Sequence, residues 1–322
     1  MAILVTGGAG FIGSCLVRTL NDMGIEDVLI VDNIHDTEKW KNLRNKRYED
    51  YIHKSALPEQ ISTLKGGISG VLHLGACSST TEKNFDYLYQ NNFVFSKMLW
   101  DFCYEMGIPF IYASSAATYG GGEAGFDDTV DIKKLQPLNG YGYSKQLFDL
   151  WVSRQTRRPP QVCGLKFFNV YGPNEYCKGS MASVLFHCFR KIKESGRIEL
   201  FKSYHPDYAD GEQMRDFVYV KDICKVVRFL MENPSVSGLF NVGTGRAESF
   251  LTLGRSIFKA LGLPESISFI DMPESLRPKY QYFTKASMDK LRAAGYREPF
   301  FSLEEGTIDY VQNYLNRDFL IY

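Results

Sequence analysis

A tyrosine and a lysine four positions apart are the residues of this 322-residue chain best suited to acid/base chemistry. Tyr141 and Lys145 stand at the start of a predicted helix, where residues four apart share one face. A phenol ordinarily loses its proton at about pH 10, and a neighbouring ammonium favours the phenolate. The pair could therefore make Tyr141 an acid/base group with Lys145 lowering its pKa, although a pair at this spacing also arises by chance in a chain of this composition and other motifs must support the assignment. Ser115, which closely follows a predicted strand, is expected to hydrogen-bond the reacting oxygen.

A glycine triplet near the start of the chain predicts a dinucleotide site. Gly7, Gly10 and Gly13 follow an apolar strand and precede a helix. Glycine permits the tight turn and the close approach of backbone to a pyrophosphate, and the helix start presents free N–H groups. Asp32 closes the second predicted strand, 28–32, where an acid usually meets the adenosine ribose. A glycine-rich turn of an unrelated α/β protein is the alternative interpretation.

Short apolar runs alternate with longer helical patterns through the first half of the chain. This rhythm is typical of a doubly wound parallel sheet, so we predict an α/β fold of the Rossmann class. The predicted strands cover 3–5, 28–31, 71–74, 109–113, 162–168 and 239–242. Apolar residues at helical spacing predict one long crossover helix over 84–106.

Past residue 173 the rhythm changes to helices and polar loops, which predicts a second, smaller lobe at the C-terminal side. The loop 203–213 looks like an exposed insertion. Because 217–220 and 239–242 again resemble core strands, we expect the first domain to take up chain near 214–243. The predicted domains are a dinucleotide-binding Rossmann domain of residues 1–168 plus about 214–243, and a substrate-binding domain of residues 169–213 plus 244–322.

The composition narrows the classes of partner. Lysine plus arginine and aspartate plus glutamate both total 37, so the formal net charge is zero. No bulk field attracts nucleic acid or an anionic membrane, and we expect neither as a partner. The chain shows neither a leader pattern nor an apolar run of about 18 residues, so we expect a cytoplasmic protein. Its seven cysteines form no Cys-x-x-Cys pair, which predicts reduced, mostly buried thiols and no metal site.

Four motifs in this order resemble the extended short-chain dehydrogenase/reductase family. They are the glycine triplet, the strand end Ser114-Ser115, Tyr141-x-x-x-Lys145 and the run Phe-Asn-Val-Tyr-Gly-Pro at 168–173. Longer stretches resemble the ADP-L-glycero-D-manno-heptose 6-epimerase branch of that family, namely 75–82, 178–184, 215–220 and 241–250. The likeness continues to 291–296, so it covers nearly the whole chain.

The resemblance implies a redox cycle that is closed within one site. Bound NADP is expected to take hydride from the sixth carbon of ADP-D-glycero-β-D-manno-heptose and to return it to the opposite face, giving the L-glycero epimer. Transient oxidation is the feasible route because the hydrogen on an unactivated carbinol carbon is not acidic. The family match implies that Tyr141 is the acid/base group for one face and Lys178 for the other. Lys145 is expected to lower the pKa of the phenol, and Ser115 to hold the reacting oxygen. A solvated loop lysine is the alternative for Lys178.

The resemblance also implies a set of cofactor contacts. They come from Gly7, Gly10, Phe11, Ile12, Gly13, Asp32, Asn33, Lys39, Lys54, Leu74, Gly75, Ala76, Cys77, Ser78, Asn91, Lys145, Val170 and Lys178. Asp32 by itself favours NAD, because its carboxylate would repel a 2′-phosphate. Asn33 and Lys39, however, stand where the family accepts NADP. We therefore expect NADP, with NAD as the alternative.

The substrate contacts implied by the resemblance come from Ser115, Asn169, Ser180, His187, Phe201, Lys202, Ser203, Tyr204, Arg215 and Tyr280. Arg215 is the natural pyrophosphate partner, since its fork of donors fits phosphate oxygens. The loop that follows Lys202 looks longer than the family pattern. A homo-oligomer, such as a pentamer, and a role in lipopolysaccharide core heptose biosynthesis are also implied.

Other functions stay open as alternatives. Another nucleotide-sugar epimerase or a dehydratase of the same family would share this fold. A 4,6-dehydratase places an Asp-Glu pair just after the strand-end hydroxyl, whereas Ala116 and Ala117 stand here, so acid and base for water elimination are missing. A non-catalytic NADP-binding protein is a further alternative, although Tyr141 and Lys145 are both present.

Overall fold

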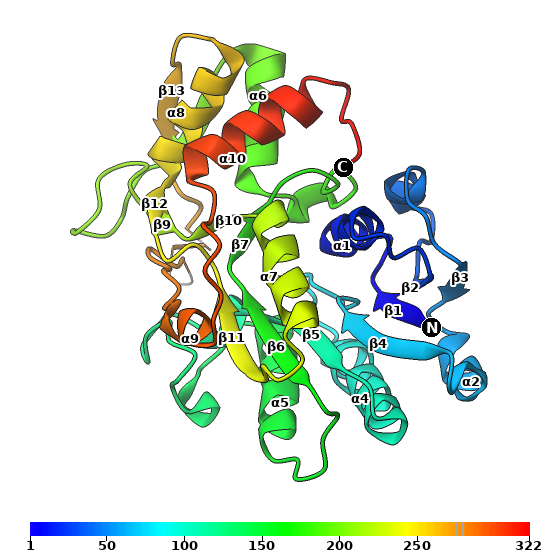
Figure 1. Cartoon of the computed structure of the whole chain (residues 1–322). Coiled ribbons are helices and arrows are strands. Elements are labelled where there is room, and N and C mark those ends of the chain that lie inside the picture. Colours follow the sequence, from blue (N-terminus) through cyan, green and yellow to red (C-terminus); the bar gives the residue numbers. More distant parts are fainter. Residues whose placement is uncertain (275, 278–279) are drawn as a thin grey trace.

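A parallel sheet of seven strands in the order β11-β6-β5-β4-β1-β2-β3 forms the centre of the computed structural model, which describes residues 1–274, 276–277 and 280–322 (Figure 1). The strands are β1 (Ala2–Thr6), β2 (Val28–Asp32), β3 (Asp50–His53), β4 (Ile68–His73), β5 (Phe110–Ser115), β6 (Val162–Phe167) and β11 (Gly238–Val242). The chain runs outward from β1 in one direction and then continues from β4 in the other. The predicted Rossmann fold is confirmed, and its switch point lies between β1 and β4.

Alternate residues of the strands feed two separate hydrophobic layers. In β1, Ile3 and Val5 pack into the layer with α1 (Phe11–Asp22) and α7 (Val220–Glu232). Ala2 and Leu4 pack into the opposite layer with α4 (Phe95–Met106) and α5 (Gly140–Ser153). Figure 1 shows the helices on both faces of the sheet. This burial on both faces explains why the strands read as continuous apolar runs.

One strand of the sheet was not predicted. β3 reads Asp-Tyr-Ile-His, and only Ile52 of its four residues is buried. It lies at the edge of the sheet, where one side and much of each face meet solvent. An edge strand of this kind carries no apolar run, so hydrophobic patterning misses it.

The long predicted crossover helix exists but is not a single α-helix. It consists of α3 (Phe85–Leu88), a π-helical turn η3 (Tyr89–Val94) and α4. The Asn84 side chain caps its start by accepting from the Tyr87 N–H at 3.1 Å, and Gly107 ends it with φ of 63°. The prediction of its extent is confirmed. The π turn carries Asn91 and Asn92, and such turns are frequent at functional sites.

The chain after β6 builds a region with three two-stranded sheets. β7 (Asn169–Tyr171) pairs with β10 (Phe217–Tyr219), β8 (Ile198–Phe201) with β13 (Ile267–Ile270), and β9 (Met214–Arg215) with β12 (Glu248–Ser249). The expected core strand over 217–220 is therefore present, but it joins β7 and not the main sheet, whereas β11 does join it. The two-domain division itself stays a prediction.

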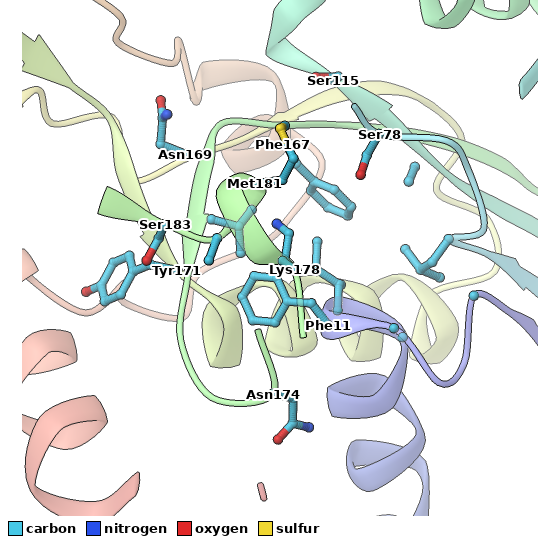
Figure 2. A pocket seen from close by; sticks show the side chains of 18 of the residues that line it. Phe11, Ser78, Ser115, Phe167, Asn169, Tyr171, Asn174, Lys178, Met181 and Ser183 are labelled. Carbon is cyan, nitrogen blue, oxygen red and sulfur yellow. The ribbon is translucent and has the colours of Figure 1, made fainter. Parts of the chain in front are cut away.

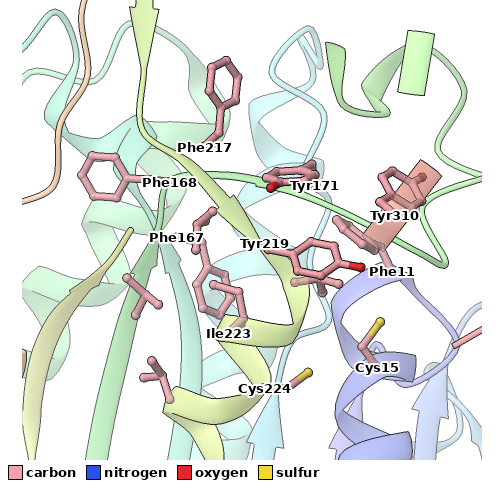
Figure 3. Close-up of a cluster of buried hydrophobic side chains, with 14 of the residues drawn as sticks. Phe11, Cys15, Phe167, Phe168, Tyr171, Phe217, Tyr219, Ile223, Cys224 and Tyr310 are labelled. Atoms are coloured by element: carbon pink, nitrogen blue, oxygen red, sulfur yellow. The ribbon is translucent and has the colours of Figure 1, made fainter. Parts of the chain in front are cut away.

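The helices of that region are α6 (Val184–Ser195), α8 (Phe250–Leu261), α9 (Asp289–Ala293), α10 (Leu303–Tyr310) and the π turn η8 (Val311–Leu315). Short turns elsewhere are η1 (Glu38–Leu43), α2 (Leu57–Gln60), η2 (Ile61–Leu64), η4 (Ala116–Tyr119), η5 (Ile132–Lys134) and η6 (Gly179–Met181). Figure 3 shows that side chains of α1, β10 and α10 meet in one cluster, including Phe11, Tyr219 and Tyr310. The hydrophobic core is thus continuous from the main sheet into this region.

All seven cysteines are free thiols, and five of them are buried, as predicted. Over the ranges that the structure describes, no helix combines the length and the apolar character needed to cross a membrane. Nor do the described residues form a group of three or more His, Cys, Asp or Glu side chains suited to a metal ion.

Candidate active site

A cavity of about 530 Å³ opens where the carboxyl ends of β1, β4 and β5 meet the segment from 167 to 185 (Figure 2). It lies at the switch point of the sheet, where crossovers lead away on both sides and leave a crevice. Thirteen residues predicted to bind the cofactor line it besides Lys145, namely Gly7, Gly10, Phe11, Ile12, Gly13, Asp32, Lys39, Leu74, Gly75, Ala76, Ser78, Val170 and Lys178. Ser115, Tyr141, Lys145 and Asn169 line it as well. The four residues predicted to be catalytic therefore face one space.

The glycine turn forms a cradle that side chains would fill. A Cβ on Gly13 would lie 2.1 Å from the Gly7 carbonyl oxygen, and one on Gly7, whose φ is +68°, would lie 2.8 Å from the Gly75 nitrogen. The first turn of α1 contains no acidic residue, and Gly10 supplies no side-chain cap. The N–H groups at this helix start are therefore available to a diphosphate, so the residues present fit a dinucleotide.

Asp32 is already engaged by three donors. Its Oδ2 accepts from the Ala9 N–H at 2.9 Å, while its Oδ1 accepts from the Asn33 N–H at 2.7 Å and from Lys39 Nζ at 2.8 Å. The carboxylate is only 7% exposed. Lys39 thus neutralises the charge that made Asp32 alone an argument for NAD.

The Ser115, Tyr141 and Lys145 side chains reach the cavity. Burial raises the pKa of Tyr141, and a hydrogen bond from Ser115 partly opposes that rise. Lys145 Nζ donates to the Ala113 carbonyl of β5 at 2.9 Å. Burial lowers the pKa of Lys145 to about 8, although Asp149 acts in the other direction. In the protein alone burial is the largest influence on the pKa of Tyr141, and the expectation that Lys145 lowers this pKa stays a prediction.

Lys178 is not a solvated loop lysine. Its Nζ lies 5.1 Å from the centroid of the Phe11 ring, and Figure 2 shows the two side chains together in the cavity. Burial lowers its pKa, which the neighbouring Glu175 partly offsets. Glu175 is itself held by the Ser183 N–H and hydroxyl at 2.6 and 2.8 Å. The ammonium is therefore directed into the site.

A buried ion pair beneath the cavity was not predicted. Lys166 Nζ of β6 lies 2.7 Å from Asp149 Oδ2 of α5, and both side chains are at most 1% exposed. Asp149 also accepts from the Tyr112 and Ser114 hydroxyls, at 3.0 and 2.7 Å, while Lys166 donates to Thr118 at 2.6 Å. The pair joins β5, β6 and α5 next to the end of β5. The sequence marks each residue as unusual, since Asp149 follows Lys145 by four residues on the same helix and Lys166 interrupts an apolar strand, but it does not indicate that the two form a pair.

Four of the predicted cofactor residues lie beside the cavity and not in its lining, namely Asn33, Lys54, Cys77 and Asn91. Lys54 Nζ donates to Asn91 Oδ1, and Asn91 donates to Asn92 Oδ1 at 2.9 Å. Asn92 in turn bonds both backbone groups of Cys77, at 2.8 and 2.9 Å. Asn92, which sequence reasoning did not select, therefore connects three of these four residues.

Only two of the ten predicted substrate residues, Ser115 and Asn169, line the cavity. Ser180 and His187 are exposed. Lys202 and Tyr204 both bind Asp271, at 3.2 and 3.0 Å, and Ser203 donates its N–H to Asp210 at 2.7 Å. Arg215 is buried between the rings of Phe250 and Tyr280, at 5.5 and 5.3 Å, and the Phe201 ring lies 6.4 Å from Tyr280. Phe250 lines the cavity, so Arg215 stands immediately behind its wall.

Apolar side chains that no motif marks complete the lining. Met181, Ala182 and Leu185 come from the segment before and within α6, and Phe217 and Leu253 come from β10 and α8. These residues look like ordinary core residues in the sequence, so residue type and spacing give no signal for them.

Comparisons with known proteins agree with this geometry. The sequence profile of the NAD dependent epimerase/dehydratase family matches residues 3–243. The chain is 53% identical over 315 residues to the ADP-L-glycero-D-manno-heptose-6-epimerase of Nitratidesulfovibrio vulgaris, with 97% of each chain covered. It is 51% identical over 327 residues to the protein of that name from Fusobacterium nucleatum, with 98% of each covered. The solved ADP-L-glycero-D-manno-heptose-6-epimerase of Helicobacter pylori superposes with a TM-score of 0.81 at 28% identity, covering 97% of this chain and 95% of that one.

The lowered pKa of Lys145 predicts a specific pH dependence of stability. Its pKa falls from 10.5 to about 8 on folding, so between these values the unfolded chain binds the additional proton and the free energy of unfolding rises with pH. Lys145→Met removes this contribution. Between about pH 8 and about pH 10, the unfolding free energy of the wild type should therefore gain on the order of 2 to 3 kcal/mol relative to the variant.

Urea unfolding across this pH range measures the difference. Lys133→Met, the same substitution at an exposed lysine, is the control and should show a constant difference from the wild type. A constant difference for Lys145→Met as well would contradict the buried, proton-releasing lysine.

Proposed function

The chain belongs to the NAD dependent epimerase/dehydratase family, and from this premise we propose that it is an epimerase of ADP-heptose. It interconverts ADP-D-glycero-β-D-manno-heptose and ADP-L-glycero-β-D-manno-heptose, in lipopolysaccharide core heptose biosynthesis. The observation that carries the proposal is the meeting of Ser115, Tyr141 and Lys178 in one cavity beside the glycine turn. The identity of over one half to relatives of that name, along nearly the full chain, supports the choice of substrate.

The reaction removes hydride from one face of the sixth carbon and returns it to the other, and with each hydride transfer a proton leaves or rejoins the oxygen on that carbon. Bound nicotinamide supplies the hydride acceptor and donor for the sixth carbon of the heptose. In one direction of the reaction, Lys178, whose pKa burial lowers, would accept the hydroxyl proton as hydride leaves the carbon. Tyr141, whose raised pKa favours the protonated phenol, would donate a proton to the oxygen as hydride returns, and the two roles exchange in the reverse direction. Ser115 hydrogen-bonds the same oxygen and keeps it in place during the transfer.

Arg215 is the residue proposed to hold the diphosphate of the substrate. Its guanidinium is buried, and within the described ranges its hydrogen bonds include only the Met214 carbonyl, at 2.8 Å, and no carboxylate. A buried charge without a partner is costly, so an anion that binds here offsets the cost of burial. The planar fork of donors suits two phosphate oxygens.

We further propose NADP as the cofactor within a family whose name specifies NAD. A 2′-phosphate next to Asp32 would meet a carboxylate that Lys39 already neutralises at 2.8 Å. Lys39 also donates to the Asn33 carbonyl at 2.8 Å, which leaves one of its three donors for a phosphate oxygen. The ion pair therefore supports NADP where Asp32 alone would disfavour it.

The family likeness supports three broader proposals. The chain divides into a Rossmann domain of residues 1–168 plus about 214–243 and a substrate domain of residues 169–213 plus 244–322. It acts in the cytoplasm. It assembles as a homo-oligomer, such as a pentamer.

An NMR assay of ADP-glycero-manno-heptose tests the function directly. Purified protein, with and without added NADP, is incubated with either epimer, and both should yield the same mixture of the two. UDP-galactose under the same conditions should remain unchanged. Turnover of UDP-galactose in place of ADP-heptose would instead make the protein a 4-epimerase of UDP-sugars.

Removing either acid/base group should abolish turnover and spare the cofactor. Tyr141→Phe and Lys178→Met should each lower turnover by at least about 100-fold, the usual scale for a general acid or base. The dissociation constant of NADP, measured by fluorescence, should stay the same. Tyr143→Phe is the control, because Tyr143 is 45% exposed on the same helix and its ring lies 5.4 Å from that of Phe85. Normal turnover of either active-site variant would contradict the proposal that Tyr141 and Lys178 are the two acid/base groups.

Lys39→Met tests the choice of cofactor. It leaves the Asp32 carboxylate unbalanced, so NADP should bind at least about tenfold more weakly, the scale of one charge-assisted hydrogen bond, while NAD binds as before. Lys41→Met is the control, because Lys41 pairs with the exposed Glu38 at 2.5 Å on the same turn. Equal weakening of NAD and NADP would show that Lys39 does not discriminate between them.

A further inference from the structure

A line of buried polar side chains runs behind the cavity without lining it. Its members are Thr6 of β1, His73 of β4, Asn92 and Ser96 of the long helical crossover, and Ser144 of α5. Each is at most 1% exposed. Five buried polar groups in a row carry a high cost unless all of them are satisfied, so their hydrogen bonds define a fixed arrangement.

The hydrogen bonds of this line run in one direction. The Ser96 hydroxyl donates to the Asn92 carbonyl at 2.7 Å, so its oxygen accepts from His73 Nε2 at 2.8 Å. His73 is therefore neutral with its proton on Nε2, and Nδ1 accepts from the Thr6 hydroxyl at 2.6 Å. The Thr6 oxygen accepts in turn from the Gly75 N–H at 3.1 Å. Burial, together with the charge of Lys145, lowers the pKa of His73 to about 3 and keeps this tautomer uncharged.

The other end of the line reaches the helix that carries Tyr141. Asn92 Nδ2 donates to the Cys77 carbonyl and to the Ser144 hydroxyl, at 2.9 and 3.0 Å. The Ser144 hydroxyl then donates to the Tyr141 carbonyl at 2.7 Å. Thr6, His73 and Ser96 thus connect the Gly75 amide to the π turn, and Asn92 connects that turn to both Cys77 and α5.

We propose that His73 is a positioning residue that fixes the cofactor segment 75–77 relative to Tyr141. It needs one ring nitrogen to accept and the other to donate, on opposite sides of one rigid ring, which no other neutral side chain provides. The segment it holds lines the cavity at Gly75 and Ala76, opposite the helix with the phenol. A displacement of either side alters the distance between cofactor and acid/base group, on which the rate of transfer depends steeply.

A double-mutant cycle across His73 tests the line. Thr6→Val and Ser96→Ala each break it on one side of the ring. Each should weaken NADP binding and lower turnover of ADP-heptose at saturating cofactor by about tenfold, the scale of one buried hydrogen bond with its partner left unpaired. The double variant should lose no more binding or turnover than the single variant with the larger loss, because one substitution already breaks the line. Losses that multiply to about 100-fold would overturn the proposal.

Two control variants separate positioning from packing. Thr6→Ser keeps the hydroxyl and should behave like the wild type, whereas an equal loss with Thr6→Val would point to packing of the methyl group and overturn the proposal. Ser256→Ala removes a matched helical hydroxyl, which donates to the Thr252 carbonyl at 2.9 Å in α8. It should lower the melting temperature as Ser96→Ala does and leave NADP binding and turnover unchanged. The line is also contradicted if Ser96→Ala behaves like Ser256→Ala.

The turnover readout rests on the proposed function, whereas the binding readout does not. If the wild type binds NADP without converting ADP-heptose, the function is wrong, and the dissociation constants of the four proteins in the cycle still decide on the line. If the wild type converts ADP-heptose and the two substitutions act independently in both readouts, the line is wrong and the function stands.

Discussion

The contact between two glycines sets the geometry on which the rest of the molecule depends. Any Cβ on Gly13 would overlap the Gly7 carbonyl oxygen, so α1 can pack this closely on β1 only with glycine at that position. The same turn brings Gly7 against Gly75 at the end of β4. Since the strand order changes direction between β1 and β4, the contact lies at the floor of the crevice that the topology leaves open. The positions of the α1 start, of the segment after β4 and of the end of β5 relative to one another therefore depend on this contact.

Buried charge follows a clear division around that crevice. Asp149 is paired with the ammonium of Lys166, and Asp216 accepts hydrogen bonds from the N–H groups of Thr244, Gly245 and Ala286 at 2.7 to 3.0 Å. Such groups are satisfied without a ligand and serve to hold strands and loops together. Arg215, directly next to Asp216, is buried between two rings with no described carboxylate bound to it. The buried carboxylates nearby are thus bonded within the protein, and Arg215 stays available to an anion that binds from outside.

The parts of the molecule that hydrophobic patterning or a continuous motif encodes could be predicted from the sequence. Six of the seven strands of the main sheet and the glycine turn belong to this class, and most cofactor residues line the cavity because they lie within a few short loops. β3 was not predicted because this polar edge strand shows no alternation of apolar residues. On the substrate side the sequence names residues but not their arrangement, because Arg215 and Tyr280 come from separate elements and only their packing in three dimensions brings them behind one wall. The Asp149–Lys166 pair needs the register of α5 on β6, which no local pattern specifies.

The Tyr141-x-x-x-Lys145 spacing shows that a motif does not specify every partner of its side chains. Residues four apart lie on the same face of a helix. That face fixes the side on which a long side chain leaves the helix, but not the group to which its end binds. The Lys145 ammonium is bound by the Ala113 carbonyl, so it ties α5 to β5 and holds Tyr141 beside Ser115. Burial then keeps the phenol protonated in the protein alone. A positively charged nicotinamide ring in this cavity would favour the phenolate, so the acidity of Tyr141 is set by what binds next to it more than by its neighbour on the helix.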